Sequence, residues 1–299
     1  MACPAPPALR GTMREQEPMA RHTTWRVGGP AQRFYEPADR DDLAALLRSL
    51  PPDEPLFWLG LGSNLLVRDG GIRGTVIHTT GRLSALERLE GDRIRVEAGV
   101  PCPRVARFCA QERLTGAEFL AGIPGTMGGA LQMNAGAFGG ETWALVAGVE
   151  TVDRQGVQRR RDPAEYRIGY RSVQGPPGEW FCAATLQLES GDPRAARQRV
   201  RDLLERRGAT QPTGLPSAGS VFRNPPGDHA ARLIEAAGLK GASIGGARVS
   251  TKHANFIINS GGASAADIEA LIERVEAVVL EKHGVELQRE VHIVGERLP

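Results

Sequence analysis

The stretch EFLAGIPGTMGGALQMNAGAFGG (Glu118–Gly140) decides the fold, because it sets seven glycines and one proline among apolar residues and carries no charge after Glu118. Glycine costs conformational entropy on folding, so such a cluster marks positions where a side chain would obstruct a close approach or where φ is positive. The cluster favours a backbone that lies against a flat, bulky cofactor. The alternative is a glycine-rich connection that only permits tight turns.

A second glycine turn lies in PLFWLGLGSNLLV (Pro55–Val67), where two apolar runs flank Gly60–Asn64. The pattern predicts a strand, a tight turn, and a second strand or a helix start. Successive backbone N–H groups in such a turn form a concave anion site, and the side chains of Ser63 and Asn64 add donors, which suits a pyrophosphate. The turn is neither a P-loop nor a complete Rossmann fingerprint, because the Lys-Ser/Thr pair and the third glycine are missing.

Composition excludes several classes of protein. A length of 299 residues predicts two or three lobes. The net charge is only +2 and 5% of residues are aromatic, which argues against a nucleic-acid-binding surface. The short run Arg159–Arg161 is interpreted as a solvated face. The cysteines have no metal-ligand spacing, so we expect free thiols and no metal site; they are Cys3, Cys102, Cys109 and Cys182.

No apolar run approaches the roughly 20 residues that span a bilayer, and the first residues do not have the pattern of a signal peptide. We therefore expect a cytoplasmic protein without membrane insertion. Residues 1–20 are rich in proline and poor in periodic apolar residues, which predicts a mobile tail in which Met13 or Met19 is an alternative start.

Beyond the tail, helical and strand-like patterns alternate, which indicates an α/β or α+β organisation. Helices are predicted over 39–50, from Pro103 onward, from Asp192 to about Arg207 with a break at Gly208 and Pro212, over 230–237 with Asp228 as the cap, and from Ser264 to Gly284. Strands are predicted over 93–98 and 285–294, and a hairpin over 149–157. We place a lobe boundary near Pro212.

Three further segments have side chains suited to catalysis or binding. In PSAGSVFRNP (Pro216–Pro225), Ser220 is either a turn hydroxyl or a proton-transfer group, while Arg223 and Asn224 can bind phosphate or sugar. The sequence around Ser220 is not a nucleophile elbow. In LQREVHI (Leu287–Ile293), Glu290 lies on the face opposite the apolar residues; it either meets solvent or, if another lobe covers it, serves as an acid.

The third segment, Tyr170-Arg171, is preceded by Tyr166-Arg167, and a guanidinium near apolar strands needs an anionic partner, either structural or a substrate carboxylate. In addition, Lys252 and His253 form a polar cluster with Asn255 in the otherwise β-like run STKHANFIIN (Ser250–Asn259), where they can line a pocket.

Taken together, these blocks resemble the UDP-N-acetylenolpyruvoylglucosamine reductase (UDP-N-acetylmuramate dehydrogenase) family, the flavoenzymes of the second step toward UDP-N-acetylmuramate in bacterial peptidoglycan synthesis. The resemblance covers about residues 21–296, in the blocks His22–Pro30, Leu59–Val67, Gly122–Gly129, Met133–Gly136, Tyr170-Arg171, Pro216–Pro225, Gly238–Asn259 and Leu287–Gly295. The chain lacks the tyrosine-bearing insertion of the longer subtype, so it resembles the shorter one.

The resemblance implies an α+β fold: an FAD-binding module of two α/β lobes of the vanillyl-alcohol-oxidase (PCMH) type, followed by a C-terminal α+β substrate-binding lobe. The module is expected over residues 21–191 with a split near 82, a connecting helix over 192–210, and the substrate lobe with its return strand over 211–299. The oligomeric state is left open, and a monomer is compatible with the sequence.

The resemblance also implies bound FAD, with NADPH as co-substrate and UDP-N-acetylglucosamine enolpyruvate as the substrate. The pyrophosphate is expected in the Gly60–Asn64 turn and the flavin against the Gly122–Gly136 segment. The cofactor-binding residues expected by this likeness are Gly60, Leu61, Gly62, Ser63, Asn64, Leu65, Gly122, Ile123, Pro124, Gly125, Thr126, Gly128, Gly129, Asn134 and Gly136.

By the same likeness, Ser220 is the proton donor, and Glu290 and Arg171 stabilise developing negative charge. The implied substrate-binding residues are Tyr170, Arg223, Asn224, Lys252 and His253. The family usually has one residue between the arginine and the serine that follows it, whereas Ser172 follows Arg171 directly, so Arg167 is a rival for the family arginine. Two other functions remain open: an FAD oxidoreductase with a different substrate, and a nucleotide-sugar-binding protein without activity.

Overall fold

The computed structural model describes residues 9–298, and these form two compact units. Unit 1 comprises the described residues up to 14, residues 34–60 and residues 74–205; unit 2 comprises residues 15–33 and 61–73 and the described residues from 206 onward. Each unit is therefore assembled from segments that lie far apart in the sequence. The predicted lobes, in contrast, follow one another in sequence order.

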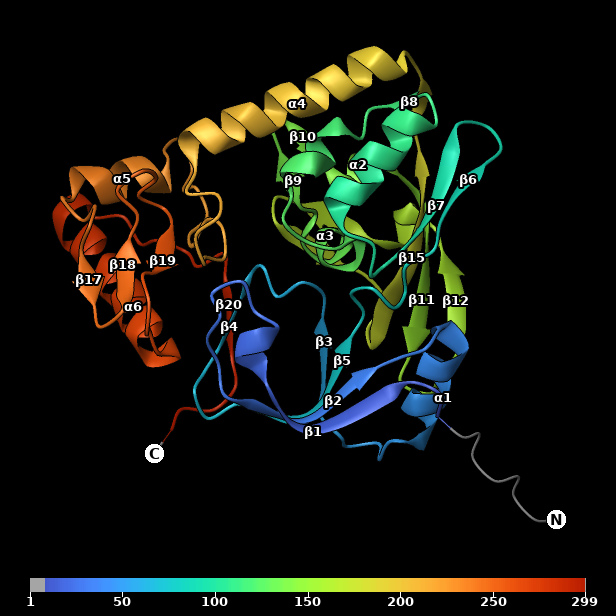
Figure 1. Cartoon of the computed structure of the whole chain (residues 1–299), viewed down its shortest axis with the longest axis horizontal. Coiled ribbons are helices and arrows are strands. Elements are labelled where there is room, and N and C mark those ends of the chain that lie inside the picture. The colour runs from blue at the N-terminus through green and yellow to red at the C-terminus, as the bar shows by residue number, and fades with distance from the viewer. Residues whose placement is uncertain (1–8, 299) are drawn as a thin grey trace. The chain divides into compact units, whose positions relative to one another are not determined.

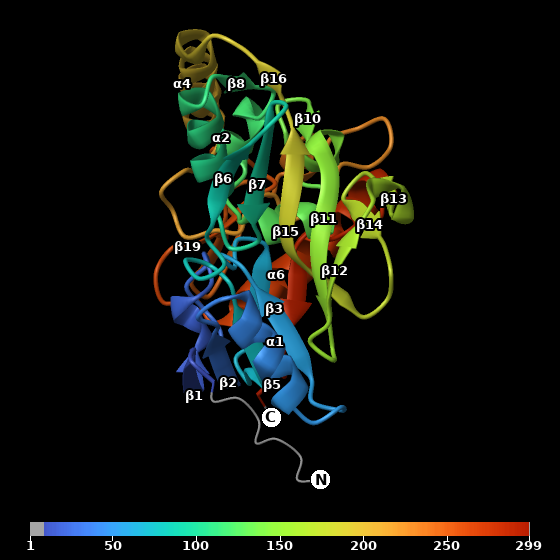
Figure 2. The ribbon, with the colours of Figure 1, turned by 90° about the vertical axis from the view of Figure 1, so that its right-hand side faces the viewer.

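The centre of unit 1 is an antiparallel sheet of five strands in the order β12-β11-β15-β7-β6 (Figure 2). The β11–β12 hairpin turns at Asp153, whose Oδ1 accepts hydrogen bonds from the N–H groups of Gln155 and Val157, both at 2.9 Å. The predicted hairpin and the strand predicted over 93–98 are thus confirmed. The strands are β6 (Leu86–Leu89), β7 (Arg93–Glu97), β11 (Val146–Asp153), β12 (Gln158–Arg161) and β15 (Glu179–Gln187).

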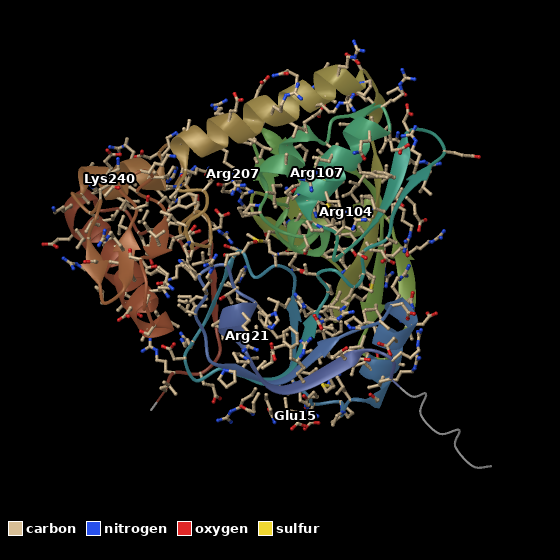
Figure 3. The ribbon with its side chains drawn as sticks, viewed as in Figure 1. Glu15, Arg21, Arg104, Arg107, Arg207 and Lys240 are labelled. Atoms are coloured by element: carbon tan, nitrogen blue, oxygen red, sulfur yellow. The ribbon has the colours of Figure 1, made fainter. Side chains whose placement is uncertain are left out.

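Helices α2 (Cys102–Gln111) and α3 (Met127–Met133) pack against this sheet (Figure 1). Proline starts α2 as predicted, and the helix is amphipathic: Val105 and its neighbours on the inner face are buried, while Arg104 and Arg107 project from the outer face (Figure 3). The glycine-rich stretch supplies the 3-10 helix η2 (Glu118–Gly122) and α3, so it forms part of this core.

A second sheet has the order β1-β2-β5-β3, with strands β1 (Thr12–Pro18), β2 (Pro30–Glu36), β3 (Leu56–Leu59) and β5 (Ile72–His78). Helix α1 (Arg40–Ser49) packs beside it and begins at Asp39, whose carboxylate accepts from the Asp42 N–H at 2.9 Å. This confirms the helix predicted over 39–50.

The prediction of a mobile tail is wrong for residues 12–18, because these form β1. The strand is mostly exposed and polar, so it lacks the apolar alternation by which a strand is recognised in a sequence. Residues 1–8 lie outside the described residues.

In unit 2, α6 (Ala265–His283) packs on a sheet of three strands, β17 (Ser243–Ile244), β18 (Ala247–Val249) and β19 (Ile257–Asn259). Ser264 and Asp267 form a capping box at its start, and Gly284, with a φ of 65°, ends it, as predicted. A stripe of buried aliphatic side chains runs along its inner face. None of the helices in the part of the chain that the structure describes is long and apolar enough to cross a membrane.

Two predicted helix boundaries are wrong. Helix α4 (Pro193–Thr210) begins at Asp192 as expected but runs through Gly208, because one glycine costs a helix only about 1 kcal/mol, whereas Pro212 cannot continue it. Asp228 does not cap α5 (Ala230–Ala236). Instead, Oδ1 of Asn224 accepts from the Ala230 N–H at 3.1 Å, and Asp228 pairs with Arg232.

The predicted C-terminal strand over 285–294 is shorter than expected. Only β20 (His292–Val294) forms, and it pairs in parallel with β4 (Leu65–Val67). Before it, Arg289 makes a single antiparallel bridge with Phe222. The alternation of buried side chains at Leu287 and Val291 nevertheless holds, because both contribute to the apolar core of unit 2.

Several short elements complete the fold. They are η1 (Met19–Arg21), β8 (Leu114–Thr115), β9 (Gly136–Ala137), β10 (Gly140–Glu141), η3 (Thr142–Leu145), η4 (Pro163–Glu165), β13 (Arg167–Gly169), β14 (Ser172–Gln174) and β16 (Glu189–Ser190).

The cysteines of the described residues are free, as predicted, and all three are buried. Burial disfavours the thiolate and raises the pKa of each thiol, Cys102, Cys109 and Cys182, to about 12. These thiols are therefore unreactive core side chains. Cys3 lies outside the described residues.

A partly buried ion pair links Arg68, the residue that follows β4, to α6 within unit 2. Arg68 donates from Nε and Nη2 to the two carboxylate oxygens of Glu269 at 2.9 and 2.8 Å, and from Nη1 to the Gly295 carbonyl at 3.1 Å. Glu269 is 5% exposed. The hydrogen bonds from Arg68 lower the pKa of Glu269 to about 2.

We expect Glu269→Gln to lower the free energy of unfolding by roughly 2 kcal/mol at neutral pH, because the variant leaves the Arg68 guanidinium without its charge partner. A carboxylate whose pKa is lower in the folded state stabilises the protein fully above its unfolded value of 4.5, and loses this effect as the pH falls toward about 2. Denaturant titrations of both proteins between pH 7 and pH 2.5 should therefore show a difference that shrinks in acid. A constant difference would contradict this account.

Candidate functional site

In unit 2, the predicted glycine turn packs against residues 22–24. Gly62 has a φ of 66°, and a Cβ built on it would lie 2.1 Å from the carbonyl oxygen of His22. The Thr24 N–H donates to the Gly62 carbonyl at 3.2 Å. Glycine is therefore required at this position for both conformation and space. The neighbouring side chain of Leu61 is exposed, whereas Leu65 is buried in β4.

The side chain of Asn64 is partly used inside unit 2. Its Nδ2 donates to the Glu290 carbonyl at 3.0 Å, which ties the turn to the segment that carries a predicted catalytic carboxylate. Ser63 beside it is half-buried. The turn thus has the conformation predicted from the sequence, and it fixes the main chain at Glu290.

Gly60, which belongs to unit 1, lies against a buried hydroxyl. A Cβ on Gly60 would lie 2.4 Å from Oγ1 of Thr126. Thr126 is 2% exposed, and among the described residues its Oγ1 has no hydrogen-bond partner. A buried hydroxyl without a partner is costly, so this atom fits a cofactor oxygen that completes its hydrogen bonding.

The glycines of the Gly122–Gly140 segment differ in what surrounds them. A Cβ on Gly122 would lie 2.5 Å from the ring of Phe138, and one on Gly140 would lie 2.5 Å from that of Phe119. A Cβ on Gly128 would lie 3.0 Å from the Cβ of Ala98. These glycines allow the segment to pack against other residues of unit 1. The sequence had instead suggested contact with a flat cofactor or tight turns as the reason for the glycines.

Gly129 is different, because a Cβ built on it meets no atom of the described residues within 4 Å. This position is exposed, as is Pro124, whereas Gly125 is half-buried and Ile123 is buried. The exposed backbone at Gly129 has the room that the predicted flat cofactor needs. Together with the Thr126 hydroxyl, it makes this end of the segment fit FAD.

Asn134 ends α3 in the left-handed conformation, with a φ of 45°, and is 1% exposed. Its Nδ2 donates to Glu141 at 2.9 Å and to the Gly169 carbonyl at 3.2 Å, while its Oδ1 accepts from the Trp143 N–H at 3.1 Å. Both amide hydrogens are therefore used by protein groups. This geometry favours a structural role rather than the predicted contact with the cofactor.

The hairpin of β13 and β14 has Tyr170 and Arg171 at its tip. Arg171 has a φ of 52°, and its Nη2 donates to the carbonyl of Gly136 at 3.3 Å. The guanidinium also lies over the Tyr170 ring, which is 52% exposed, at 5.3 Å from its centroid. The hairpin thus brings Arg171 to the glycine-rich segment.

The rival pair, Tyr166-Arg167, has a different environment. Tyr166 packs against Trp143 and Phe181, with ring centroids 4.8 and 5.6 Å away, and Arg167 is exposed at the start of β13. Burial raises the pKa of Tyr166 to about 12. The tyrosine of this pair is therefore a core side chain, and the geometry favours Arg171 as the family arginine.

In unit 2, Ser220 and Glu290 lie in two neighbouring segments that are joined by hydrogen bonds and by the Phe222–Arg289 bridge. Gly219 has a φ of 72°, and Ser220 after it is half-buried. The next residue, Val221, accepts a hydrogen bond at its carbonyl from the Glu290 N–H at 2.8 Å. Glu290 is half-buried, so it is not a fully solvated strand residue. The structure thus brings these two predicted catalytic residues together.

Four of the predicted substrate-binding residues belong to unit 2: Arg223, Asn224, Lys252 and His253. The Arg223 N–H donates to the Gln288 carbonyl at 2.9 Å, next to the bridge between Phe222 and Arg289. Oδ1 of Asn224 caps α5, and Nζ of Lys252 donates to the Gly208 carbonyl. His253 is half-buried and packs edge-on against Phe256.

Burial lowers the pKa of His253, so the imidazole is neutral at physiological pH. Among the described residues its Nδ1 has no hydrogen-bond partner, although the atom is buried. This nitrogen can therefore accept or share a hydrogen bond with a ligand. It makes His253 a stronger candidate than its neighbour Lys252, which is exposed.

The importance of Asn255 was not predicted from the sequence, where this residue is only one member of a polar cluster. An amide between Ala254 and Phe256 in an apolar run must be satisfied by protein groups if it is buried. Asn255 is 4% exposed and hydrogen-bonded to Phe222 through both atoms of its amide.

We expect Thr126→Val to raise the dissociation constant for FAD about tenfold, because the variant keeps the shape but removes the buried hydroxyl. The Thr126 side chain makes no cap hydrogen bond, so the cofactor-free protein should be as stable as the wild type or more so. FAD titration and thermal unfolding of the FAD-free protein measure the two effects separately. Thr126→Ser, which keeps the hydroxyl, is the matched control; unchanged FAD affinity in Thr126→Val would exclude this role.

Two known domain families match the sequence. Residues 31–161 match an FAD binding domain, and residues 211–294 match the C-terminal domain of UDP-N-acetylenolpyruvoylglucosamine reductase. The first match contains the Gly60–Asn64 turn and the glycine-rich segment. The second contains Ser220, Arg223 and Glu290.

Named relatives match over nearly the whole chain. The chain is 66% identical to the UDP-N-acetylenolpyruvoylglucosamine reductase of Alkalilimnicola ehrlichii over 96% of both chains. It is 65% identical to that of Methylococcus capsulatus over 96% of this chain and 94% of the relative. Among solved structures, the reductase of Thermus caldophilus superposes with a TM-score of 0.82 at 34% identity, covering 96% of this chain and 99% of that one.

Proposed function

Because the chain belongs to the UDP-N-acetylenolpyruvoylglucosamine reductase family, we propose that it reduces UDP-N-acetylglucosamine enolpyruvate to UDP-N-acetylmuramate with bound FAD and NADPH, in peptidoglycan synthesis. The observation that carries the proposal is the pairing of the Ser220 segment with Glu290 in the region that matches the reductase C-terminal domain. The reaction belongs in the cytoplasm, where NADPH is available.

FAD fits the residues of the glycine turns. The Gly60–Asn64 turn would hold the pyrophosphate, and the open backbone at Gly129 would face the flavin, with the Thr126 hydroxyl bonding to a cofactor oxygen. When bound, FAD supplies the redox chemistry by taking a hydride from NADPH and delivering it to the terminal carbon of the enolpyruvyl group.

Arg171 and Glu290 would stabilise the negative charge that hydride addition creates. Addition at the terminal carbon leaves negative charge on the neighbouring carbon and on the substrate carboxylate, so the site needs cationic and proton-sharing groups there. Arg171 provides the guanidinium, whose planar donors match a carboxylate. Its anchor on the Gly136 carbonyl keeps it beside the glycine-rich segment.

Ser220 completes the reaction by giving its hydroxyl proton to the carbanionic carbon. The double bond then has gained one hydride and one proton, which is the balance that the saturated lactyl product requires. A hydroxyl is a weak acid, but a developing carbanion is a strong base, so the transfer is feasible when the geometry is fixed.

The remaining polar residues bind the nucleotide sugar. Arg223 and Lys252 supply positive charge for the diphosphate. Asn224 can offer its amide N–H groups to the sugar, because its Oδ1 already accepts from α5. The neutral imidazole of His253 offers Nδ1, and Tyr170 offers an exposed ring beside Arg171.

The proposal is tested by an anaerobic absorbance experiment on the purified protein. NADPH should bleach the visible flavin band, and UDP-N-acetylglucosamine enolpyruvate added afterwards should restore it. Bleaching without recovery would indicate an FAD oxidoreductase with a different substrate. A colourless protein that cannot be reconstituted with FAD would exclude the flavoenzyme.

We expect Ser220→Ala to leave flavin reduction by NADPH nearly unchanged and to slow flavin reoxidation by the enolpyruvyl substrate roughly a hundredfold or more, because only the second half-reaction needs the proton. Stopped-flow absorbance measures the two halves separately. Glu290→Gln should show the same pattern. Equal loss in both halves would refute the role of Ser220, and an unaltered second half would remove Glu290 from the site.

The two candidate arginines are separated by a matched pair of variants. Arg171→Lys should slow flavin reoxidation about tenfold or more, because a lysine loses the planar donor geometry. Arg167→Lys should change it less than about twofold, because Arg167 is exposed at the start of β13. The reverse ranking of the two variants would identify Arg167 as the family arginine.

A further inference from the structure

Asn255 lies in the loop between β18 and β19 of unit 2 (Figure 1). Its Oδ1 accepts from the Phe222 N–H at 3.0 Å, and its Nδ2 donates to the Phe222 carbonyl at 2.8 Å. Its own carbonyl accepts from the Val221 N–H at 2.9 Å. One buried residue thus makes three hydrogen bonds to the two residues that follow Ser220.

The segment before Ser220 is tied to β19, the strand that follows the loop of Asn255. Ser217 makes an antiparallel bridge with Ile258, and the Asn259 N–H donates to the Pro216 carbonyl at 3.0 Å. Ser217 is paired with Ile258, and Val221 is paired with Asn255. Val221 comes four residues after Ser217, whereas Ile258 comes only three residues after Asn255. One extra residue is therefore accommodated, as in a β-bulge, and Gly219 with its φ of 72° provides the necessary conformation.

The opposite side of the segment is tied to the extended segment of Glu290, just before β20. The Val221 carbonyl accepts from the N–H groups of Glu290 at 2.8 Å and Val291 at 3.3 Å. Ser220 is therefore the last residue of the bulge, and Val221 after it is hydrogen-bonded on both sides, to Asn255 and to Glu290. A bulge changes the direction of the side chains next to it, and that direction depends on the hydrogen bonds that hold the ends of the bulge.

We propose that Asn255 is a positioning residue that closes this bulge and so aims the Ser220 hydroxyl. The proposal rests on the proposed function, in which Ser220 gives the proton. Asn255 does not touch the reacting atoms itself, because both ends of its amide are used on Phe222. An amide is required, because no carboxylate or aliphatic side chain of this size can both donate to the carbonyl and accept from the N–H of one residue.

The test is a double-mutant cycle between Asn255→Asp and Ser220→Ala. Asn255→Asp keeps the size and the acceptor but loses the donor to the Phe222 carbonyl. In the wild-type background, we expect flavin reoxidation by the enolpyruvyl substrate to slow about tenfold, with flavin reduction by NADPH changed less than about twofold. In the Ser220→Ala background, the same substitution should change reoxidation less than about twofold, because the hydroxyl it aims is gone.

Asn259→Asp is the matched control. Asn259 is the last residue of β19, and its Nδ2 donates to the carbonyl of Trp25 at 3.0 Å, so the variant has a similar structural cost but leaves the Asn255 amide untouched. It should not slow reoxidation selectively. The solvent deuterium isotope effect on reoxidation should rise in Asn255→Asp and not in Asn259→Asp, because a misaimed hydroxyl makes proton transfer slower.

Other outcomes would overturn the proposal. An equal slowing by Asn255→Asp in both backgrounds, or equal loss of both half-reactions, would show a general structural effect. If Asn255→Asp does not fold, Asn255→Ser, which keeps a hydrogen-bonding group near Phe222, replaces it in the cycle with the same criteria. If the wild-type flavin is bleached by NADPH but not restored by the substrate, the proposed function fails and this inference fails with it; recovery in the wild type with additive variants removes the inference alone.

Discussion

The hydrogen bond from the Glu290 N–H to the Val221 carbonyl is the contact on which the site of unit 2 depends. It joins two segments that are far apart in the sequence, and each brings its own polar groups to the junction. The Glu290 carbonyl is in turn held by Asn64 of the glycine turn. These two contacts therefore connect the turn expected to hold a pyrophosphate with the residues expected to transfer a proton and stabilise charge. The arrangement is fixed by main-chain groups and by the side chain of Asn64.

In unit 1, the packing of the glycine-rich segment depends on glycines, which have no side chain. Phe119 and Phe138 fill the spaces that side chains at Gly140 and Gly122 would need, and the segment can then fold closely on itself. Asn134 completes this arrangement by binding the end of α3 to the hairpin that carries Arg171. Gly122, Gly128 and Gly140 thus act through packing, whereas the backbone at Gly129 is open to a ligand.

Much of this could be predicted from the sequence, because the signals were local. The capping box at Ser264, the proline at the start of α2 and the strand-turn-strand pattern around Gly62 depend on neighbouring residues, and the structure confirms all three. The exposed strand β1 lacked an apolar alternation and was predicted as a tail. Likewise, Asn224 was selected for its chemistry, but its role as the cap of α5 depends on a turn that only the structure shows.

The least predictable features required contacts between distant segments. Nothing in the local sequence of Asn255 points to Phe222, and the reason for glycine at position 60 is a threonine hydroxyl that lies in another block. Such requirements are steric or hydrogen-bonding relations between two places in the chain, so one segment alone does not reveal them. The family resemblance supplied the order of the blocks, but the contacts between them came from the structure.

The interleaved make-up of unit 2 has a consequence for how the protein is made. Trp25, which is fully buried in the core of this unit, donates from its indole N–H to the carbonyl of Ile257 at 2.7 Å, and Leu66 packs in the same core. On the ribosome, these early residues are synthesised long before their partners. Their apolar side chains therefore stay exposed, where they can bind chaperones or aggregate, until nearly the entire chain has left the ribosome. Folding of unit 2 is therefore completed late, although its first residues are among the earliest to be translated.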